Sequence, residues 1–209
     1  MNRLTLILIS SIFLSPTVSA ETAASLCNRL FDGASYSDAV TPCTSAAEEG
    51  DLNAQTILGE LYDHSNGVAA DASQSARWWG EAAAQGHLPA QNLLALKYYY
   101  GGTVFGPEEG WDQDYNKAME IWRSSAEQGE PTSQFMLGEM YKLGQGVSRN
   151  PETAYAWFML SSQGGYKLAT DGAMEMSRIM TPQQKQRAKQ LLNDYTLLFS
   201  EKTSFTIAH

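Results

Sequence analysis

Residues 137–147, LGEMYKLGQGV, nearly duplicate residues 58–68, LGELYDHSNGV. Both stretches begin with Leu-Gly, carry a tyrosine three residues after the glycine and end in Gly-Val. An active-site loop is rarely present twice in one chain, whereas the packing unit of a repeat protein recurs by necessity. The duplication therefore predicts a repeat architecture, and it supplies the period with which the rest of the chain can be aligned.

The alignment contains four units. Their first residues, Ala54, Ala90, Ser133 and Ala169, are separated by 36, 43 and 36 residues, so one seven-residue insertion restores a common period. At fixed offsets come a leucine, a small residue and a tyrosine: Leu58, Gly59 and Tyr62; Leu94, Ala95 and Tyr98; Leu137, Gly138 and Tyr141. This spacing places the three side chains on one face of a helix, and the small residue lets a second helix approach closely.

A second helix is expected in each unit. Asp71, Asp114 and Asn150 are typical N-caps, and Pro151 suits a first helical position. Each second helix should end at a glycine in the left-handed conformation: Gly50, Gly86, Gly129 and Gly165. Because neither helix of a pair can bury its apolar stripe alone, neighbouring pairs must stack. We therefore expect an all-α fold, a right-handed α/α superhelical solenoid of helix-turn-helix repeats.

The expected solenoid covers residues 21–199. It comprises a degenerate unit at 22–53, repeats at 54–89, 90–132 and 133–168, and a capping unit at 169–199. The capping box Thr181-Pro182-Gln183-Gln184 predicts a C-terminal capping helix. The apolar face of that helix carries Ala188, Leu191, Leu192 and Tyr195. Residues 200–209 lack helical periodicity and are expected to form a frayed tail.

Residues 1–20 have the pattern of a secretory signal peptide. One positive charge at Arg3 precedes about eleven apolar residues, and Val18-Ser19-Ala20 lies before Glu21. An uncleaved anchor is the alternative, although the apolar run is too short to span a bilayer as a helix. Without Arg3 the chain has 13 basic and 23 acidic side chains, a formal charge of −10, which disfavours nucleic acid and anionic membranes as partners. We expect an exported protein, periplasmic or secreted, without stable membrane insertion.

Cys27 and Cys43 are the two cysteines of the chain. In an oxidising compartment they favour one disulfide, which would join the two helices of the first unit; a free buried pair is the alternative. A metal site needs more ligands than this pair, and the three histidines, His64, His87 and His209, lie elsewhere in the sequence. No metal or cofactor is expected.

The repeat resembles the Sel-one-like repeat (SLR) family, a branch of the tetratricopeptide-type solenoids. The family pattern is A-x-x-x-L-G-x-x-Y-x-x-G-x-G-V, followed by an N-cap Asp and W-x-x-x-A-A-x-x-G. Residues 54–68 and 133–147 match it closely, whereas the middle unit has Ala95 and Thr103 in place of glycines and the insertion FGPEEGW. The resemblance implies a scaffold that holds protein partners in exported or membrane-associated assemblies. Some cysteine-rich relatives are linked to penicillin binding or β-lactamase activity, but their cysteines recur in every repeat.

In tetratricopeptide-like stacks the first helix of each pair lines the concave wall. The face of these helices opposite the core is predicted to carry Thr56, Glu60, Asp63, Asn92, Leu96, Tyr99, Phe135, Glu139, Lys142, Asp171, Glu175 and Arg178. Apolar anchors among acidic groups suit a protein or peptide segment that bears positive charge, and the alternative is a set of merely solvated positions. Phe105 and Trp111 of the insertion are a second candidate site, unless they fold back over the neighbouring turns.

The sequence contains no H-E-x-x-H, P-loop, G-x-S-x-G or C-x-x-C motif. The expected function is therefore that of an exported non-catalytic scaffold or adaptor in the bacterial envelope, with a protein or peptide partner in the concave groove. One alternative is a β-lactam-processing or peptidoglycan-modifying enzyme, which would need a nucleophile and a base that converge in a pocket. The other is a structural subunit of a larger envelope machine.

Overall fold

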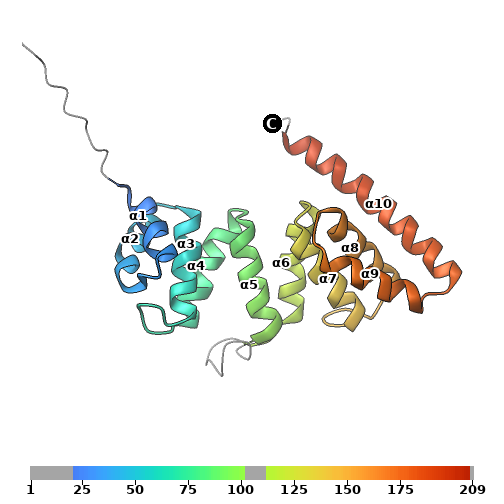
Figure 1. Ribbon diagram of the computed structural model, residues 1–209, viewed down its shortest axis with the longest axis horizontal. Coiled ribbons are helices and arrows are strands. Elements are labelled where there is room, and N and C mark those ends of the chain that lie inside the picture. Colours follow the sequence, from blue (N-terminus) through green and yellow to red (C-terminus); the bar gives the residue numbers. More distant parts are fainter. Residues whose placement is uncertain (1–20, 102–111, 208–209) are drawn as a thin grey trace, which may run out of the picture.

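The protein consists of helical hairpins that lie side by side in a row (Figure 1). The computed structural model describes residues 21–101 and 112–207, with side chains as far as residue 199. In these residues it has ten helices and no strand: α1 (Ala23–Asp32), α2 (Tyr36–Glu48), α3 (Leu52–Asp63), α4 (Ala72–Ala84), α5 (Leu88–Tyr100), α6 (Tyr115–Glu127), α7 (Pro131–Leu143), α8 (Pro151–Gln163), α9 (Leu168–Ile179) and α10 (Pro182–Ile207). The predicted signal peptide, residues 1–20, and the candidate loop residues Phe105 and Trp111 lie outside the described residues.

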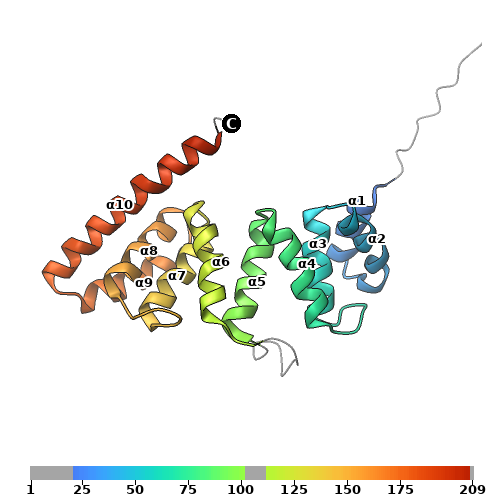
Figure 2. The same ribbon diagram turned by 180° about the vertical axis from the view of Figure 1, so that it is seen from behind.

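The first eight helices form four hairpins, α1–α2, α3–α4, α5–α6 and α7–α8, and α9 begins a fifth unit. Helix α2 packs on α3, α4 on α5, α6 on α7 and α8 on α9, so each hairpin shares a boundary with the next. The two opposite views show the same row (Figures 1 and 2). The prediction of an all-α solenoid built from stacked helix pairs is confirmed.

The predicted caps begin and end the second helices. Asp71, Asp114 and Asn150 each accept hydrogen bonds from two backbone N–H groups in the first turn of the helix that follows. All four predicted terminal glycines have a positive φ, between 83° and 96°. Local chemistry therefore fixes the helix ends, as the sequence indicated.

A buried ring lies over the small residue in two of the first helices, α3 and α7. Gly59 faces Trp79, and Gly138 faces Phe158, so closely that a Cβ atom at either glycine would come within 2.4–3.0 Å of the ring. The Trp79 Nε1–H group donates to the backbone oxygen of Thr56, at 3.0 Å. In the second repeat, which has an alanine, the indole of Trp122 donates instead to the side chain of Asn92, at 2.9 Å. The small residue thus sets how deeply the second helix docks.

Three buried glutamines, one per repeat, connect each hairpin to the preceding one. The amide nitrogens of Gln55, Gln91 and Gln134 donate to the carbonyl oxygens of Ala47, Ala83 and Ala126, at 3.0–3.1 Å. These carbonyls belong to the last turns of α2, α4 and α6, and each also accepts a hydrogen bond from the backbone N–H of the terminal glycine, at 3.0–3.1 Å. The glutamine side chains therefore add a second hydrogen bond to these carbonyls and tie neighbouring repeats together, a role that the sequence reasoning missed.

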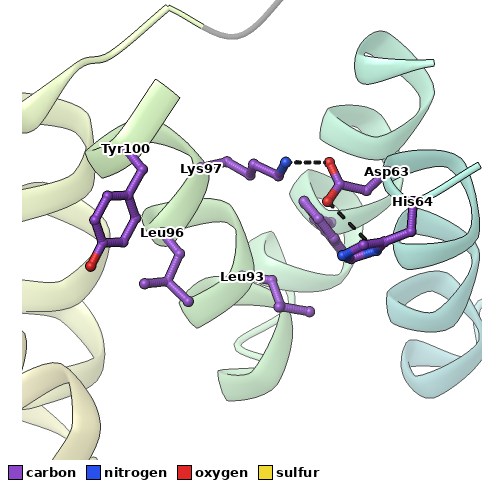
Figure 3. A pocket seen from close by; sticks show the side chains of 7 residues that line it. Asp63, His64, Leu93, Leu96, Lys97 and Tyr100 are labelled. Atoms are coloured by element: carbon purple, nitrogen blue, oxygen red, sulfur yellow. Dashed lines mark ion pairs between the residues drawn. The ribbon is translucent and has the colours of Figure 1, made fainter. Parts of the chain in front are cut away.

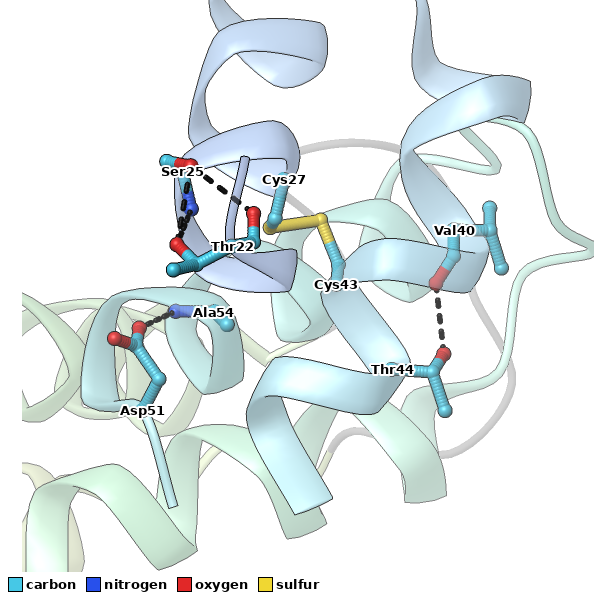
Figure 4. The surroundings of a disulfide bond; sticks show 8 residues. All are labelled: Thr22, Ser25, Cys27, Val40, Cys43, Thr44, Asp51 and Ala54. Atoms are coloured by element: carbon cyan, nitrogen blue, oxygen red, sulfur yellow. Dashed lines mark hydrogen bonds between the residues drawn. A yellow bond between two sulfur atoms is a disulfide. The ribbon is translucent and has the colours of Figure 1, made fainter. Parts of the chain in front are cut away.

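The N-terminal hairpin is crosslinked. A disulfide joins Cys27 of α1 to Cys43 of α2, and both residues are fully buried (Figure 4). They lie in a core cluster that includes Ala39, Leu58 and Trp78, so the bond is embedded where α1 and α2 meet α3 and α4. The predicted pairing is confirmed.

Helix α10 caps the other end but does not repeat the hairpin pattern. Only Met180 and Thr181 separate it from α9, so the chain turns sharply and α10 lies obliquely across the last hairpins, packed mainly on α8 (Figure 2). Tyr195 and Phe199 stack against Trp157, with ring centroids 4.9 and 5.7 Å away. The helix also continues to Ile207, beyond residue 199, where the missing periodicity had predicted its end.

Candidate functional site

Helices α3, α5, α7 and α9 form one face of the row, called here the first-helix wall. The twelve residues predicted to lie on it divide by exposure. Asp171, Glu175 and Arg178 are exposed; Glu60, Asn92, Leu96, Phe135, Glu139 and Lys142 are half-buried; Thr56, Asp63 and Tyr99 are buried. The prediction that the last three line an open surface is wrong, and each is buried for a specific reason.

Tyr99 is an internal anchor between repeats. Its ring lies 5.3 Å from the rings of Tyr115 and Trp122, and its hydroxyl donates to the side-chain oxygen of Gln145, in the turn after α7. Burial raises the pKa of Tyr99 to about 12, so the phenol stays neutral. Its aromatic surface is used within the protein and is not available to a partner.

Thr56 and His87 form a polar link between the first two repeats. The Thr56 hydroxyl donates to the Leu52 carbonyl oxygen at 2.8 Å, and its oxygen lies 2.9 Å from Nδ1 of His87. His87 is the residue that precedes α5, so this contact joins the first turn of α5 to the middle of α3. Burial also lowers the pKa of His87, which favours the neutral ring. The arrangement suits a structural contact.

Asp63 of α3 is buried together with Lys97 of α5, and the two side chains form an ion pair between these helices. Lys97 Nζ lies 2.6 Å from Asp63 Oδ1, and the two side chains are 5% and 1% exposed. The positions equivalent to Lys97 in the other units are apolar and fully buried: Leu61, Met140 and Met176. A buried ion pair is often no more stabilising than apolar side chains of similar volume. The repeat fold therefore does not itself require charges at this boundary.

A pocket of about 220 Å³ lies beside this ion pair, between α3 and α5 (Figure 3). The residues that line it are Asp63, His64, Trp79, Leu93, Leu96, Lys97 and Tyr100. His64 donates from Nδ1 to the Glu60 carbonyl oxygen at 3.1 Å, and the same nitrogen lies 3.7 Å from Asp63 Oδ2. The carboxylate oxygens of Asp63 are buried beneath this lining, so the accessible surface of the pocket is apolar.

The C-terminal half of the wall is charged. Lys142 Nζ lies 2.9 Å from Glu139 and 3.3 Å from Glu175, so it bridges α7 to α9. Although partial burial acts in the opposite direction, these two carboxylates raise the pKa of Lys142. Phe135 packs on Phe158 and Tyr166, with centroid distances of 5.6 and 4.9 Å, which leaves little of its ring to a partner.

The sequence reasoning missed a row of exposed apolar side chains at the C-terminal ends of three first helices. We call Tyr100, Leu143 and Ile179 the rim row; they are 40%, 53% and 53% exposed. The three residues are separated by 43 and 36 positions, the same intervals that relate the repeats. The sequence already contained this regularity. Aligning the repeats as far as the last residue of each first helix would have placed the three residues in one column.

Two further properties concern the described parts of the chain. Residues 21–101 and 112–207 contain no group of three histidine, cysteine, aspartate or glutamate side chains placed to hold a metal ion. Within the same ranges, no helix has the length and apolar character needed to cross a bilayer.

Comparisons with known proteins identify the repeat. A family model described as Sel1 repeat matches residues 52–87, 88–130 and 131–166. The chain is 33% identical over 114 residues to the chitin synthase regulator SKT5 of Saccharomyces cerevisiae and 28% identical over 142 residues to the alginate biosynthesis protein AlgK of Pseudomonas syringae. These matches cover 54% and 66% of this chain, but only 16% and 28% of those proteins. A protective antigen of uropathogenic Escherichia coli with an SLR fold superposes with a TM-score of 0.71 at 28% identity, over 87% of this chain and 39% of that one.

Proposed function

Because the chain belongs to the Sel1 repeat family, we propose that it is an exported, non-catalytic adaptor that holds a protein partner against the first-helix wall. Proteins built from this repeat mediate protein–protein interaction. The observation that carries the proposal is the rim row: Tyr100, Leu143 and Ile179 expose apolar surface at one equivalent position of successive repeats. A solvated helix end needs no apolar side chain there, whereas a partner that lies along the row can bury all three.

The charges next to the rim row indicate the partner's chemistry. One helical turn before each rim residue the wall has Leu96, Glu139 or Glu175, and Asp171 adds a further exposed carboxylate. Lys142 is already neutralised by its two glutamates. Arg178 adds an exposed cation beside Ile179, so Glu139, Glu175 and Asp171 exceed Lys142 and Arg178 by one negative charge. This small excess favours a segment with a basic side chain beside apolar ones, because complementary charges speed and orient docking.

The disulfide supports export. Structural disulfides persist in oxidising compartments and are rare in reducing ones. Together with the secretory pattern of residues 1–20, it favours the bacterial periplasm or the exterior. SKT5 and AlgK, by their names, act in chitin synthase regulation and alginate biosynthesis, so we expect the partner among envelope proteins of polysaccharide synthesis.

The test compares wall variants in the native envelope. Leu143→Asp and Ile179→Asp place a charge in the rim row, and Ser124→Asp adds the same charge to an exposed position of the second helix α6. After crosslinking and affinity capture, both rim variants should recover the partner several-fold less well than the wild type, with unchanged helicity. Ser124→Asp should recover it normally. Equal recovery by all three variants would exclude the wall as the binding surface.

A further inference from the structure

The turn between α3 and α4 contains the dipeptide Asn66-Gly67. Asparagine is a chemically labile residue, because the backbone nitrogen of the next residue can attack its side-chain carbonyl carbon. Glycine at the next position leaves this approach open, since it has no side chain. In a folded chain the attack also needs a backbone nitrogen that is not held by a hydrogen bond.

The fold protects the other asparagines that the structure describes. Asn150 is followed by Pro151, whose nitrogen carries no proton to lose. The remaining ones lie in helices, where a hydrogen bond within the helix or to its N-cap holds the N–H group of the next residue: Asn28, Asn53, Asn92, Asn116 and Asn193.

Asn66 lacks this protection. Among the described residues, neither its side-chain amide nor the N–H group of Gly67 forms a hydrogen bond. Gly67 is exposed, so water has access to the dipeptide. The third repeat has Gln145 at the position of Asn66, and its longer side chain is held: it accepts from the Tyr99 hydroxyl and donates to that of Tyr115, at 3.1 Å.

We propose that Asn66 is a site of covalent modification in the folded chain, where it converts to aspartate and isoaspartate, and that the isoaspartate loosens the turn from α2. The nitrogen of Gly67 forms a bond to Cγ of Asn66, the Cγ–Nδ2 bond breaks, and the amide leaves with the proton of that nitrogen as ammonia. Water then opens the resulting succinimide at either carbonyl carbon. The inference is independent of the proposed function.

The second part of the proposal follows from a close contact of the turn. Gly67 has a φ of 76°, and a Cβ atom there would come within 2.7–2.8 Å of backbone atoms of Tyr36 and Ser37, at the start of α2. Isoaspartate lengthens the backbone by a methylene group directly before this glycine. The turn then cannot keep both its left-handed conformation and its contact with α2.

The first test follows the asparagines of the full chain by peptide mapping with tandem mass spectrometry, during incubation in mildly alkaline buffer with and without urea. In the folded chain Asn66 should lose its amide several-fold faster than any helical asparagine, and a protein-isoaspartate methyltransferase should methylate the product. Asn66→Gln copies the third repeat and should remove this product, because the larger ring closes slowly. Conversion of Asn66 in urea but not in the folded chain, or faster conversion of a helical asparagine, would overturn the proposal.

The second test separates the new charge from the longer backbone. Asn66→Asp has the carboxylate on an ordinary backbone and should unfold at the temperature of the unmodified chain. The isoaspartate form, isolated by anion exchange from the incubated protein, should unfold at a lower temperature. Equal midpoints for the two forms would overturn the inferred loss of the contact with α2.

Discussion

The close approach between paired helices can be tested at Gly59. A methyl group there would lie 2.4 Å from Nε1 and 2.5 Å from Cδ1 of Trp79, a fully buried ring. Overpacking of this kind costs about 1–3 kcal/mol, and displacement of the indole also weakens its bond to Thr56, at about 1 kcal/mol. Alanine regains about 1 kcal/mol of helix propensity. Gly59→Ala should therefore destabilise the protein by about 1–3 kcal/mol.

Gly80 is the matched control, because it lies in the middle of helix α4 and no atom is found within 4 Å of the place that a methyl group would occupy. Gly80→Ala should stabilise by about 0.5–1 kcal/mol through propensity alone. Thermal unfolding followed by circular dichroism at 222 nm should give shifts of opposite sign, at about 2–4 °C for each kcal/mol. If Gly59→Ala raised the midpoint as Gly80→Ala does, the tight packing of Trp79 would be refuted.

The second repeat suggests how the Gly59 defect can be relieved. There Ala95 is accommodated while the indole of Trp122 bonds to Asn92, at the position equivalent to Thr56. Adding Thr56→Asn to Gly59→Ala copies that arrangement and should recover part of the lost stability. No recovery would mean that the side-chain acceptor is not what allows an alanine in the second repeat.

Three further predictions concern local features. Ser65 has a φ of 56° where the third repeat has Gly144 at 75°, so Ser65→Gly should stabilise by about 0.5–1 kcal/mol in urea unfolding; a loss of stability would contradict the left-handed turn. Replacing Cys27 and Cys43 by serine opens a loop of 16 residues and should lower the free energy of unfolding by about 3 kcal/mol. An unchanged free energy of unfolding would show that the bond does not form. Burial opposes ionisation of Glu130, but hydrogen bonds from the first turn of α7 hold the pKa of its carboxyl group below 4.5. The stability that this cap contributes is therefore present above pH 4.5 and is lost as the pH falls through the lowered pKa of the folded state. Glu130→Gln should therefore lose less stability than the wild type between pH 5.5 and pH 3, and identical acid sensitivity would remove Glu130 as the cause.

The helices and their ends were predictable because their signals are local. The spacing of Leu58, Gly59 and Tyr62 specifies one face of a helix, and Asp71 specifies the start of the next, within a few residues of sequence. The direction of α10 was not predictable in the same way, since it depends on a two-residue connection and on the docking of Tyr195 against α8.

The candidate site was predictable only in part. A helical projection gives the angle of a side chain, but not what the next repeat places opposite it. Tyr99 is buried by Trp122 and Gln145, and Asp63 by Lys97, and these partners lie 23 to 46 positions away in the sequence. The exposed ends Leu143 and Ile179 lie beyond the columns used for the prediction, although the repeat interval relates them.

Site-specific photocrosslinking in the native envelope tests most directly whether the first-helix wall is the binding surface. A photoreactive phenylalanine analogue placed at Leu143 or Ile179 reports on the rim row, and one at Ser124 reports on the second helices. We predict the same crosslinked partner from both rim positions and none from Ser124. Crosslinks from Ser124 alone would place the partner on the opposite face and contradict the assignment of the wall.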